Sequence, residues 1–476
     1  MKSDKLIDAI GLIDEKLIER SQKSSQKSQK REKIKRFIKW TVPVAAILAL
    51  TIGVGSLFGN TPIELSAYAL AEAKYPETAK YPTDDTTESG FKEFQKWNDE
   101  FQKRQEKFLN SGEGIEGFLG RTVPEFLSTD ENTVYSPINV YLALSMLAET
   151  ASGDTREQIL TLLEADGMKQ LRNQVNTIWN AGYRDDGIQK SILGSSLWLN
   201  EDITFKKSTI DILKNNYFAS SFQGQMGSSG YNNALKKWIN EQTGGLLKDS
   251  VENIDLPAET LMAIVTTIYF NAPWRHEFKA ENNDIKVFKG VSGDTEAEFM
   301  NKEGFIDNYY WGDSFSATYK DLEQGGKMWF VLPDEDKTVD QLLLDGEALR
   351  FMADPDDWEN RKTMKVNLSV PKFDVSSDIS LVEGLKALGI TDCFDASLAD
   401  FSNLSDNNSY ISAINHAARV KIDEEGVEAA AVTVIIDAGS AMPSGDEIDF
   451  IADRPFIFVI TSDTGLPLFV GRVNNL

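Results

Sequence analysis

Side chains that could perform bond chemistry are few in this chain. It contains two histidines, His276 and His416, and a single cysteine, Cys393. Neither histidine stands in a sequence motif with a serine, a cysteine or an acid, and the sequence has no HExxH, GxSxG or phosphate-binding glycine motif. The many carboxylates are dispersed, which is typical of a solvated acidic surface. We therefore expect a protein that is not an enzyme, with no catalytic residue, no metal site and no cofactor.

Length and charge narrow the class of protein further. The chain has 476 residues, which is enough for a large buried core, and a formal net charge of −25. An acidic body argues against nucleic-acid binding, which requires a basic surface. The single Cys393 cannot form an intramolecular disulfide, and it stands in a block that we expect to be buried, which favours a structural thiol over a reactive one.

The stretch with the clearest physical meaning follows Gly426. Its side chains are small or apolar and carry no charge: Ala429, Ala430, Ala431, Val432, Thr433, Val434 and Ile435. By itself such a stretch can form a buried strand, an aggregation-prone edge or a helix end. In a strand, alternate side chains face opposite ways, so Val427, Ala429 and Ala431 would face one side and Glu428 the other. The first face is small and uncharged, so other parts of the protein could cover it, whereas Glu428 should stay in contact with solvent.

Blocks on both sides of this stretch resemble the serpin family. The chain has Ile-Ser-Ala-Ile-Asn-His-Ala-Ala-Arg-Val over residues 411–420 and Ala-Asp-Arg-Pro-Phe-Ile-Phe-Val-Ile over residues 452–460. Further similar blocks are Val-Tyr-Ser-Pro-Ile-Asn from Val134, Ile-Tyr-Phe-Asn-Ala-Pro-Trp from Ile268 and Val-Pro-Lys-Phe from Val370. The resemblance covers nearly all of residues 115–476. It is specific because these blocks occur together, although each tripeptide alone would be weak.

The resemblance implies both a fold and a function. The fold is α+β, with a large central mixed β-sheet, further sheets, about nine helices and an exposed reactive loop. The function is inhibition of a serine or cysteine protease by loop cleavage, acyl-enzyme trapping and insertion of the loop into the central sheet. The alternative is a non-inhibitory serpin that serves as a carrier, a binding module or a receptor ectodomain. The hinge of the loop is, by resemblance, Glu424, Glu425, Gly426, Val427, Glu428, Ala429, Ala430, Ala431, Val432 and Thr433.

The resemblance also places the bond that the target protease attacks. Counted from Gly426 with the family's spacing, this bond is Ser440–Ala441, and a shifted register would make Gly439 or Met442 the key residue. Small residues suit a protease with a shallow primary pocket, of elastase or subtilisin type. Trypsin-like targets are disfavoured because residues 427–448 contain no Arg or Lys.

Four residues lie, by resemblance, where the central sheet opens: Ser136, Asn139, Thr266 and His416. The family usually has serine at the position of Asn139 and asparagine at the position of Thr266. Because buried hydrogen-bond partners must match, these two departures are expected to change the barrier to opening. Asp437 would face inward late in insertion, where an unpaired carboxylate is costly unless solvent reaches it.

The N-terminal part contains a candidate membrane segment. Residues 40–58 carry no charge and match the thickness of a bilayer, and basic residues precede them. We expect a single-pass membrane protein, with a cytoplasmic segment at 1–39, a transmembrane helix at 40–60 and the serpin domain outside the cell. The alternative is a cleaved signal peptide and a secreted protein, since Ala67-Tyr-Ala69 offers small residues.

A stalk is expected between the membrane and the serpin domain, which we assign to residues 113–476. The stalk, residues 61–112, contains an amphipathic helix whose aromatic residues should pack on that domain: Phe91, Phe94, Trp97, Phe101 and Phe108. The patterned segment Leu6–Ile18 raises a further possibility, a transmembrane sensor that reports loop cleavage to the cytoplasm. The alternative is that Leu6–Ile18 is a membrane-proximal helix without a signalling role.

Overall fold

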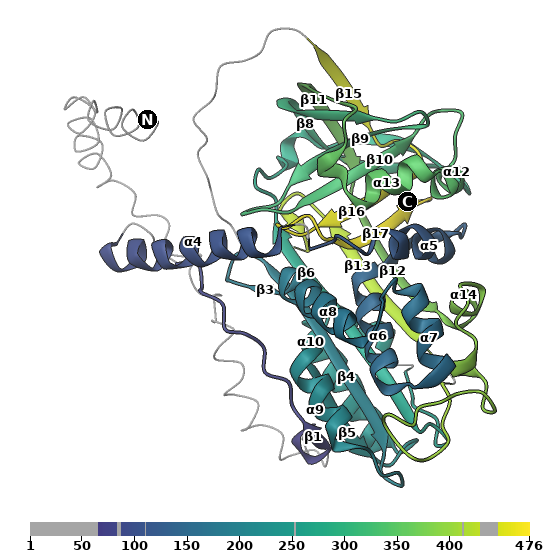
Figure 1. Ribbon diagram of the computed structural model, residues 1–476. Helices are drawn as coiled ribbons and strands as arrows, with labels where there is room; N and C mark the ends of the chain where they lie inside the picture. The colour runs from purple at the N-terminus through teal and green to yellow at the C-terminus, as the bar shows by residue number, and fades with distance from the viewer. Residues whose placement is uncertain (1–64, 83–86, 110, 252–253, 412–413, 429–445) are drawn as a thin grey trace, which may run out of the picture. The chain divides into compact units, whose positions relative to one another are not determined.

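Two large β-sheets organise the residues that the computed structural model describes (Figure 1). These residues are 65–82, 87–109, 111–251, 254–411, 414–428 and 446–476. All of them belong to one compact unit, Ile63–Leu476. The mixture of sheets and helices without strict alternation confirms the predicted α+β class.

The first sheet is mixed and has the strand order β1-β5-β4-β6-β14-β13-β12, with β3 paired to β4 beside this path. Strands β4 and β5 run parallel, whereas β4 and β6 run antiparallel. β4 is buried along nearly its whole length, as expected for an interior strand that is covered on both faces. The strands are β1 (Ala69–Ala71), β3 (Arg184–Asp185), β4 (Lys190–Asn200), β5 (Ala219–Gly224), β6 (Met262–Pro273), β12 (Phe373–Ser380), β13 (Asn415–Ile422) and β14 (Gly426–Val427).

The second sheet has the order β15-β11-β8-β9-β10-β16-β17-β2, with β7 paired to β8. Strands β11 and β15 run parallel. β16 and β17 are almost entirely apolar and are buried at every position, so they form the centre of the core. The strands are β2 (Thr133–Tyr135), β7 (Asp284–Gly290), β8 (Gly293–Trp311), β9 (Phe315–Asp321), β10 (Lys327–Pro333), β11 (Arg361–Pro371), β15 (Glu447–Ile451), β16 (Phe456–Thr461) and β17 (Pro467–Val473).

Helix α6 is the buried centre of the helical part. It begins after Ser136, whose hydroxyl accepts a hydrogen bond from the backbone N–H of Asn139, and Pro137 fits the first helical turn because its missing N–H is not needed there. The helices are α4 (Glu88–Phe108), α5 (Glu116–Leu127), α6 (Pro137–Thr150), α7 (Gly153–Leu162), α8 (Met168–Gly182), α9 (Lys207–Asn216), α10 (Ser229–Gln242), α11 (Lys248–Val251), α12 (Val339–Leu344), α13 (Gly346–Ala353) and α14 (Val382–Ala387).

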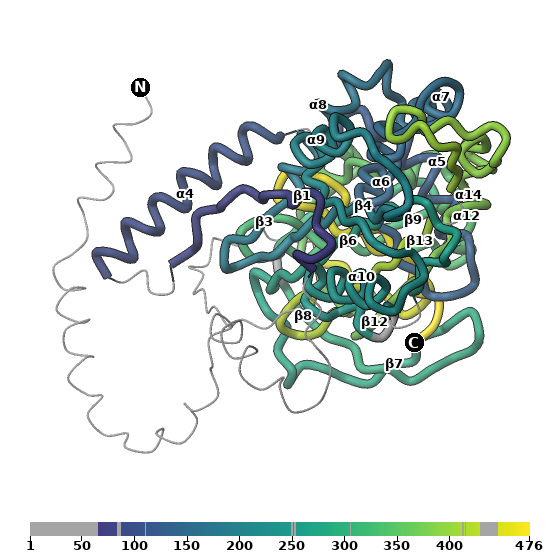
Figure 2. The backbone as a smooth tube through the Cα atoms, turned by 90° about the horizontal axis from the view of Figure 1, so that it is seen from below, coloured from purple at the N-terminus to yellow at the C-terminus, as the bar shows by residue number. Residues whose placement is uncertain are grey.

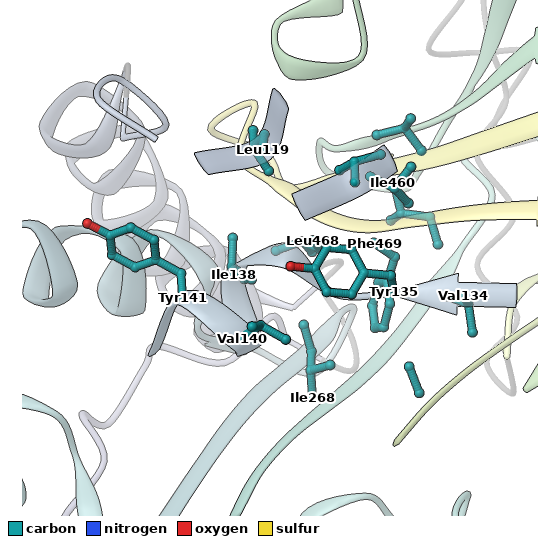
Figure 3. Close-up of a cluster of buried hydrophobic side chains, with 14 of the residues drawn as sticks. Leu119, Val134, Tyr135, Ile138, Val140, Tyr141, Ile268, Ile460, Leu468 and Phe469 are labelled. Carbon is teal, nitrogen blue, oxygen red and sulfur yellow. The ribbon is translucent and has the colours of Figure 1, made fainter. Parts of the chain in front are cut away.

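The main core lies where α5 and α6 meet both sheets. Figure 3 shows side chains of this cluster, among them Ile138 and Val140 of α6, Ile268 of β6 and Phe469 of β17. Because α6 contacts β6 of the first sheet and β17 of the second, this helix fixes the position of one sheet against the other.

The segment expected to be a stalk packs on this unit. Strand β1 pairs with β5 and so extends the first sheet by one edge strand. Figure 2 shows the chain that follows β1 running beside α4, and the rings of Tyr81 and Trp97 lie 5.0 Å apart. Trp97 and Phe108 are buried, whereas Phe91 is 53% exposed. Trp97 and Phe101 contact Asp186 and Arg184 of the domain, as expected, whereas Phe94 packs on Tyr81 of the predicted stalk itself.

The membrane prediction falls outside the described residues. Among those residues, no helix is both long and apolar enough to cross a bilayer. The predicted segments 1–39 and 40–60 lie in the part of the chain of which the structure gives no description.

Candidate functional site

The predicted hinge enters the first sheet between two of its long strands. β14 pairs antiparallel with β13 through Ile422 and Val427, and antiparallel with β6 through Gly426–Pro273 and Val427–Ala272. Within the described residues, β6 and β13 are joined only through this two-residue strand, with no direct backbone pairing between them. The two strands therefore hold a position that a longer antiparallel strand could occupy.

A tight turn fixes the start of this strand. The backbone N–H of Asp423 donates to the carbonyl oxygen of Gly426 (3.1 Å), and the N–H of Gly426 donates to the Asp423 carboxylate (3.3 Å). Trp274, just beyond the end of β6, donates its backbone N–H to the carbonyl of Glu425 (2.9 Å) and its indole N–H to the carbonyl of Asp423 (2.8 Å). These bonds hold the turn against the end of β6.

Glu424 anchors the turn by its side chain. Its carboxylate accepts hydrogen bonds from the Lys372 ammonium (2.6 Å) and from the Asn283 amide (2.6 Å). Burial raises the pKa of Glu424, but the bonds from Lys372 and Asn283 outweigh it and leave the pKa below its usual value. Glu424 is therefore ionised at neutral pH and ties the hinge to the first residue after β11.

Glu428 marks the point where the described hinge ends. Its N–H donates to the carbonyl of Lys421 (2.9 Å), which continues the pairing with β13. Its φ of +47° is a backbone conformation that non-glycine residues rarely adopt. Burial raises the pKa of its carboxyl to about 7, against the opposing effect of Arg419 and Lys421. Val427 is buried, as expected, but Glu428 is half-buried and follows the end of β14, whereas the sequence predicted that this side chain would stay in solvent.

The chain re-enters the described structure at Asp446, in the other sheet. β15 begins at Glu447 and pairs parallel with β11 of the second sheet, whereas β14 belongs to the first. The predicted attacked bond Ser440–Ala441 and the hinge residues Ala429–Thr433 lie between these points, outside the described residues. That segment therefore links the two sheets.

The structure brings the four predicted sheet-opening residues together. The backbone N–H of Ser136 donates to Nε2 of His416 on β13 (3.0 Å), and the hydroxyl of Thr266 on β6 reaches the carbonyl oxygen of Asn139 at 3.5 Å. Burial lowers the pKa of His416 to about 4, so this histidine is neutral and can accept at Nε2. The N-terminus of α6 thus contacts both strands that flank the open position.

Asn139 is imperfectly satisfied in this cluster. Its side chain is buried, and its Nδ2 has no hydrogen-bond acceptor among the residues that the structure describes. Thr266 meets the backbone of Asn139 and not its side chain. A buried donor without a partner is destabilising by about 1–3 kcal/mol.

A small apolar cavity of about 20 Å³ lies farther along the same gap. It is lined by aliphatic residues of α6, β6 and the segment before β13, among them Val140, Leu144, Ile264 and Ile414. Such a lining suits small aliphatic side chains, which are the kind found between Ala429 and Ile435.

The reactive residue types do not gather at this site. Cys393 is buried, and burial raises the pKa of its thiol to about 12, so it stays a protonated structural thiol. The described residues contain no cluster of three or more His, Cys, Asp or Glu side chains placed to hold a metal ion. The site therefore has two features: backbone groups of β6 and β13 that can pair with an inserted strand, and the small apolar cavity beside them.

Sequence analysis missed the residues that hold the turn. Trp274 lies in a block that the sequence singled out, but its two bonds to the hinge were not expected. Lys372 lies in the Val-Pro-Lys-Phe block, but its ion pair with Glu424 was not expected, and Asn283 carried no signal, because Glu424 is distant from both in sequence.

Comparison with known proteins agrees with this geometry. The family description "Serpin (serine protease inhibitor)" matches residues 120–476. The chain is similar to Serpin-ZX of Arabidopsis thaliana, with 28% identity over 75% of this chain and 95% of that protein. It is also similar to alpha-1-antiproteinase of Rattus norvegicus, with 30% identity over 73% of this chain and 84% of that protein. A solved structure of a thermophilic serpin, tengpin, in the native state superposes with a TM-score of 0.69, at 27% identity over 76% of this chain and 93% of that one.

Proposed function

Because the chain belongs to the serpin family, we propose that it inhibits a serine-type endopeptidase by inserting its cleaved reactive loop between β6 and β13. The observation that carries this proposal is the two-residue strand β14, which occupies only the first positions between those strands. The uncharged, small side chains that follow it in the sequence can continue the strand.

The proposed reaction is an interrupted proteolysis. The hydroxyl oxygen of the protease's serine attacks the carbonyl carbon of Ser440, and the amine of Ala441 leaves with the proton that the protease's histidine supplies. The protease is then joined to Ser440 by an ester bond. Insertion of the freed segment carries the acyl-enzyme away from Ala441 before water can hydrolyse the ester. The intact protein must therefore be kinetically trapped, with insertion as the release of stored free energy.

Small residues around Ser440 support a target protease with a shallow primary pocket, of elastase or subtilisin type. A cysteine protease would form the corresponding thioester. In this proposal the chain itself catalyses nothing and uses no cofactor. The alternative is a non-inhibitory function, as a binding module or as the ectodomain of a sensor. A protein with that function would not trap a protease.

The proposed location is the outer face of a cell membrane. The charge-free run at residues 40–58 and the basic residues before it support an anchor at 40–60, a cytoplasmic segment at 1–39 and an external serpin domain. A secreted, processed form is the alternative, and it would keep the same inhibitory mechanism.

The test is to incubate the full-length protein with a panel of serine and cysteine proteases. We expect a complex that survives denaturing electrophoresis with at least one protease of small-residue specificity. Mass spectrometry of the released C-terminal peptide should give Ala441 as its first residue. A trapped protease that cuts outside residues 439–443 would contradict the assigned bond, and the absence of any trapped protease would favour the rival function.

Two hinge variants provide a matched control. In the proposed strand Ala431 faces the interior and Ala430 faces solvent, so only Ala431→Arg would bury a charge on insertion. Ala431→Arg should turn the inhibitor into a substrate that is cleaved without trapping, whereas Ala430→Arg should still trap the protease. Equal behaviour of the two variants would contradict insertion in this register.

A further inference from the structure

An exposed pair of aromatic side chains lies at the C-terminal end of β8. Trp311 is 40% exposed, and its ring stacks on that of Tyr309, with the ring centres 6.2 Å apart and the ring planes at 25°. The two residues are two positions apart on one strand, so their side chains lie on the same face of the second sheet. Neither residue belongs to the hinge or to the sheet-opening cluster.

The surrounding structure holds this aromatic pair in place. The backbone N–H of Trp311 donates to the carbonyl oxygen of Asn360 (3.2 Å), and its own carbonyl oxygen accepts from the indole N–H of Trp358 (3.0 Å). Tyr309 is half-buried and packs on the main core. A large aromatic side chain that is exposed and already fixed loses little conformational entropy when a partner covers it. Such residues are common energetic anchors of protein–protein interfaces.

The aromatic pair adjoins the point where the chain re-enters the described structure. Tyr309 lies directly opposite Lys362 of β11, so their side chains share a face, and the Lys362 ammonium forms an ion pair with Asp446. The backbone N–H of Lys365 also donates to the carbonyl oxygen of Asp446 (3.0 Å), just before β15. Figure 1 shows β8, β11 and β15 as neighbours at one end of the molecule.

The length of the chain brings the proposed target protease to this face. Ala441 is five residues before Asp446, and five residues span at most about 18 Å even when fully extended. A protease domain of about 220 residues has a radius of gyration of about 17 Å, so its full width is more than twice that distance. A protease that holds the bond Ser440–Ala441 in its cleft must therefore cover part of the surface around Asp446.

A contact on this face would also supply selectivity that the loop lacks. Small residues around Ser440 fit every protease with a shallow primary pocket, so the loop sequence by itself discriminates weakly among them. A second contact outside the cleft adds a difference in affinity between proteases that cleave the same bond. The aromatic pair has the composition for such a contact, and the Lys362–Asp446 ion pair beside it provides a polar rim.

We propose that Tyr309 and Trp311 form a docking surface for the target protease. The protease receives the Trp311 ring in an apolar recess beside the part of its cleft that binds the residues after Ala441. Trp311 is then a residue that determines which protease is trapped, and it takes no part in the insertion of the loop. This inference rests on the proposed inhibitory function and names a surface that selects its partner.

The experiment uses the full-length protein and the protease that it traps fastest in the panel. It measures the second-order rate of trapping, for each titrated active inhibitor molecule, and the affinity for the same protease with its catalytic serine replaced by alanine. Trp311→Ala should lower both by at least about tenfold. Trp311→Phe keeps a ring stacked on Tyr309 and should lower both by no more than about threefold.

Two comparisons separate docking from damage to the fold. The number of inhibitor molecules consumed for each trapped protease should not change in either variant, because insertion between β6 and β13 does not involve Trp311. Leu398→Ala, at a residue that is 56% exposed on the segment between α14 and β13, should trap the protease as the parent does.

The outcomes distinguish this inference from the proposed function. A trapping rate and an affinity that stay unchanged in Trp311→Ala would overturn the docking surface and leave the inhibitory function standing. An equal fall in Leu398→Ala would also overturn it, because the effect would then not be specific to the aromatic pair. A protein that traps no protease would contradict the inhibitory function itself, and the docking surface with it.

Discussion

The backbone N–H of Ser136 donates a hydrogen bond to Nε2 of His416 over 3.0 Å, although 280 residues separate the two in sequence. The bond ties the first turn of α6 to β13, one of the two strands between which β14 lies. Nε2 can accept this bond only while the imidazole is neutral at that nitrogen. The protonation state of His416 therefore controls a contact at the place where the sheet would open.

The first prediction concerns acid stability. Burial lowers the pKa of His416 to about 4 from an ordinary value of 6.5. The unfolded chain then takes up a proton on this residue at a higher pH than the folded chain does. The contribution of neutral His416 to folding is complete above pH 6.5 and is lost as the pH falls toward 4, by about 3 kcal/mol in total.

His416→Gln separates this effect from the titration of carboxylates. The Gln side-chain oxygen can still accept from Ser136 but does not titrate. The difference in unfolding free energy between parent and variant should therefore change by about 3 kcal/mol between pH 7 and pH 4. A difference that stays constant over this range would show that His416 is not held neutral by burial.

A second prediction follows from the buried amide of Asn139. Its Nδ2 has no acceptor among the described residues, and the serpin resemblance places serine at this position. Asn139→Ser removes the unsatisfied donor and should raise the unfolding free energy by about 1 kcal/mol. Asn173→Ser, an exposed position in α8, is the control and should have no measurable effect. A loss of more than about 1 kcal/mol in Asn139→Ser would mean that the amide is satisfied.

Much of this arrangement could be predicted from sequence, and the missing part has a physical explanation. The small side chains after Gly426 predicted a buried Val427, and shared sequence blocks predicted that Ser136, Asn139, Thr266 and His416 would meet, but the half-burial of Glu428 was not predicted. The first signal is local in the sequence, and the second consists of blocks that are shared across a family. The contact of Lys372 with Glu424 depends on how distant strands meet, and no local pattern encodes it.

The N-terminal segment also contains one feature that the sequence predicts and one that it does not. Its helical aromatic stripe was visible in the sequence, but the three-residue strand β1 was not, since Ala-Leu-Ala carries no strand signal of its own. The open edge of β5 supplies the pairing partner, which is a property of the assembled sheet.

The third prediction concerns Glu428 at the exit of the hinge. Burial raises the pKa of its carboxyl to about 7, although Arg419 and Lys421 oppose this and Asp374 adds to it. The protonated carboxyl tolerates burial better than the ionised one, so protonation stabilises the observed half-buried position of Glu428. This stabilisation is lost as the pH rises from about 4.5 through about 7 and the carboxyl ionises. The hinge should therefore open more readily above pH 7.

Hydrogen exchange of residues 422–428, corrected for the intrinsic effect of pH, measures this opening. Protection of the Glu428 amide, which donates to Lys421, should fall as the pH rises from 5 to 8. In Glu428→Gln the protection should not depend on pH, whereas Glu425→Gln, at an exposed hinge position, should behave as the parent does. A parent protein with constant protection would refute the role assigned to Glu428.

The most direct test of the proposed insertion compares the unfolding midpoint of the intact protein with that of protein cleaved within residues 429–445. Insertion would bury several apolar side chains between β6 and β13 and stabilise the cleaved form by several kcal/mol. At about 1–2 °C for each kcal/mol in a domain of this size, we predict a midpoint higher by about 5 °C or more after cleavage. An unchanged or lower midpoint would contradict the claim that the loop enters the sheet.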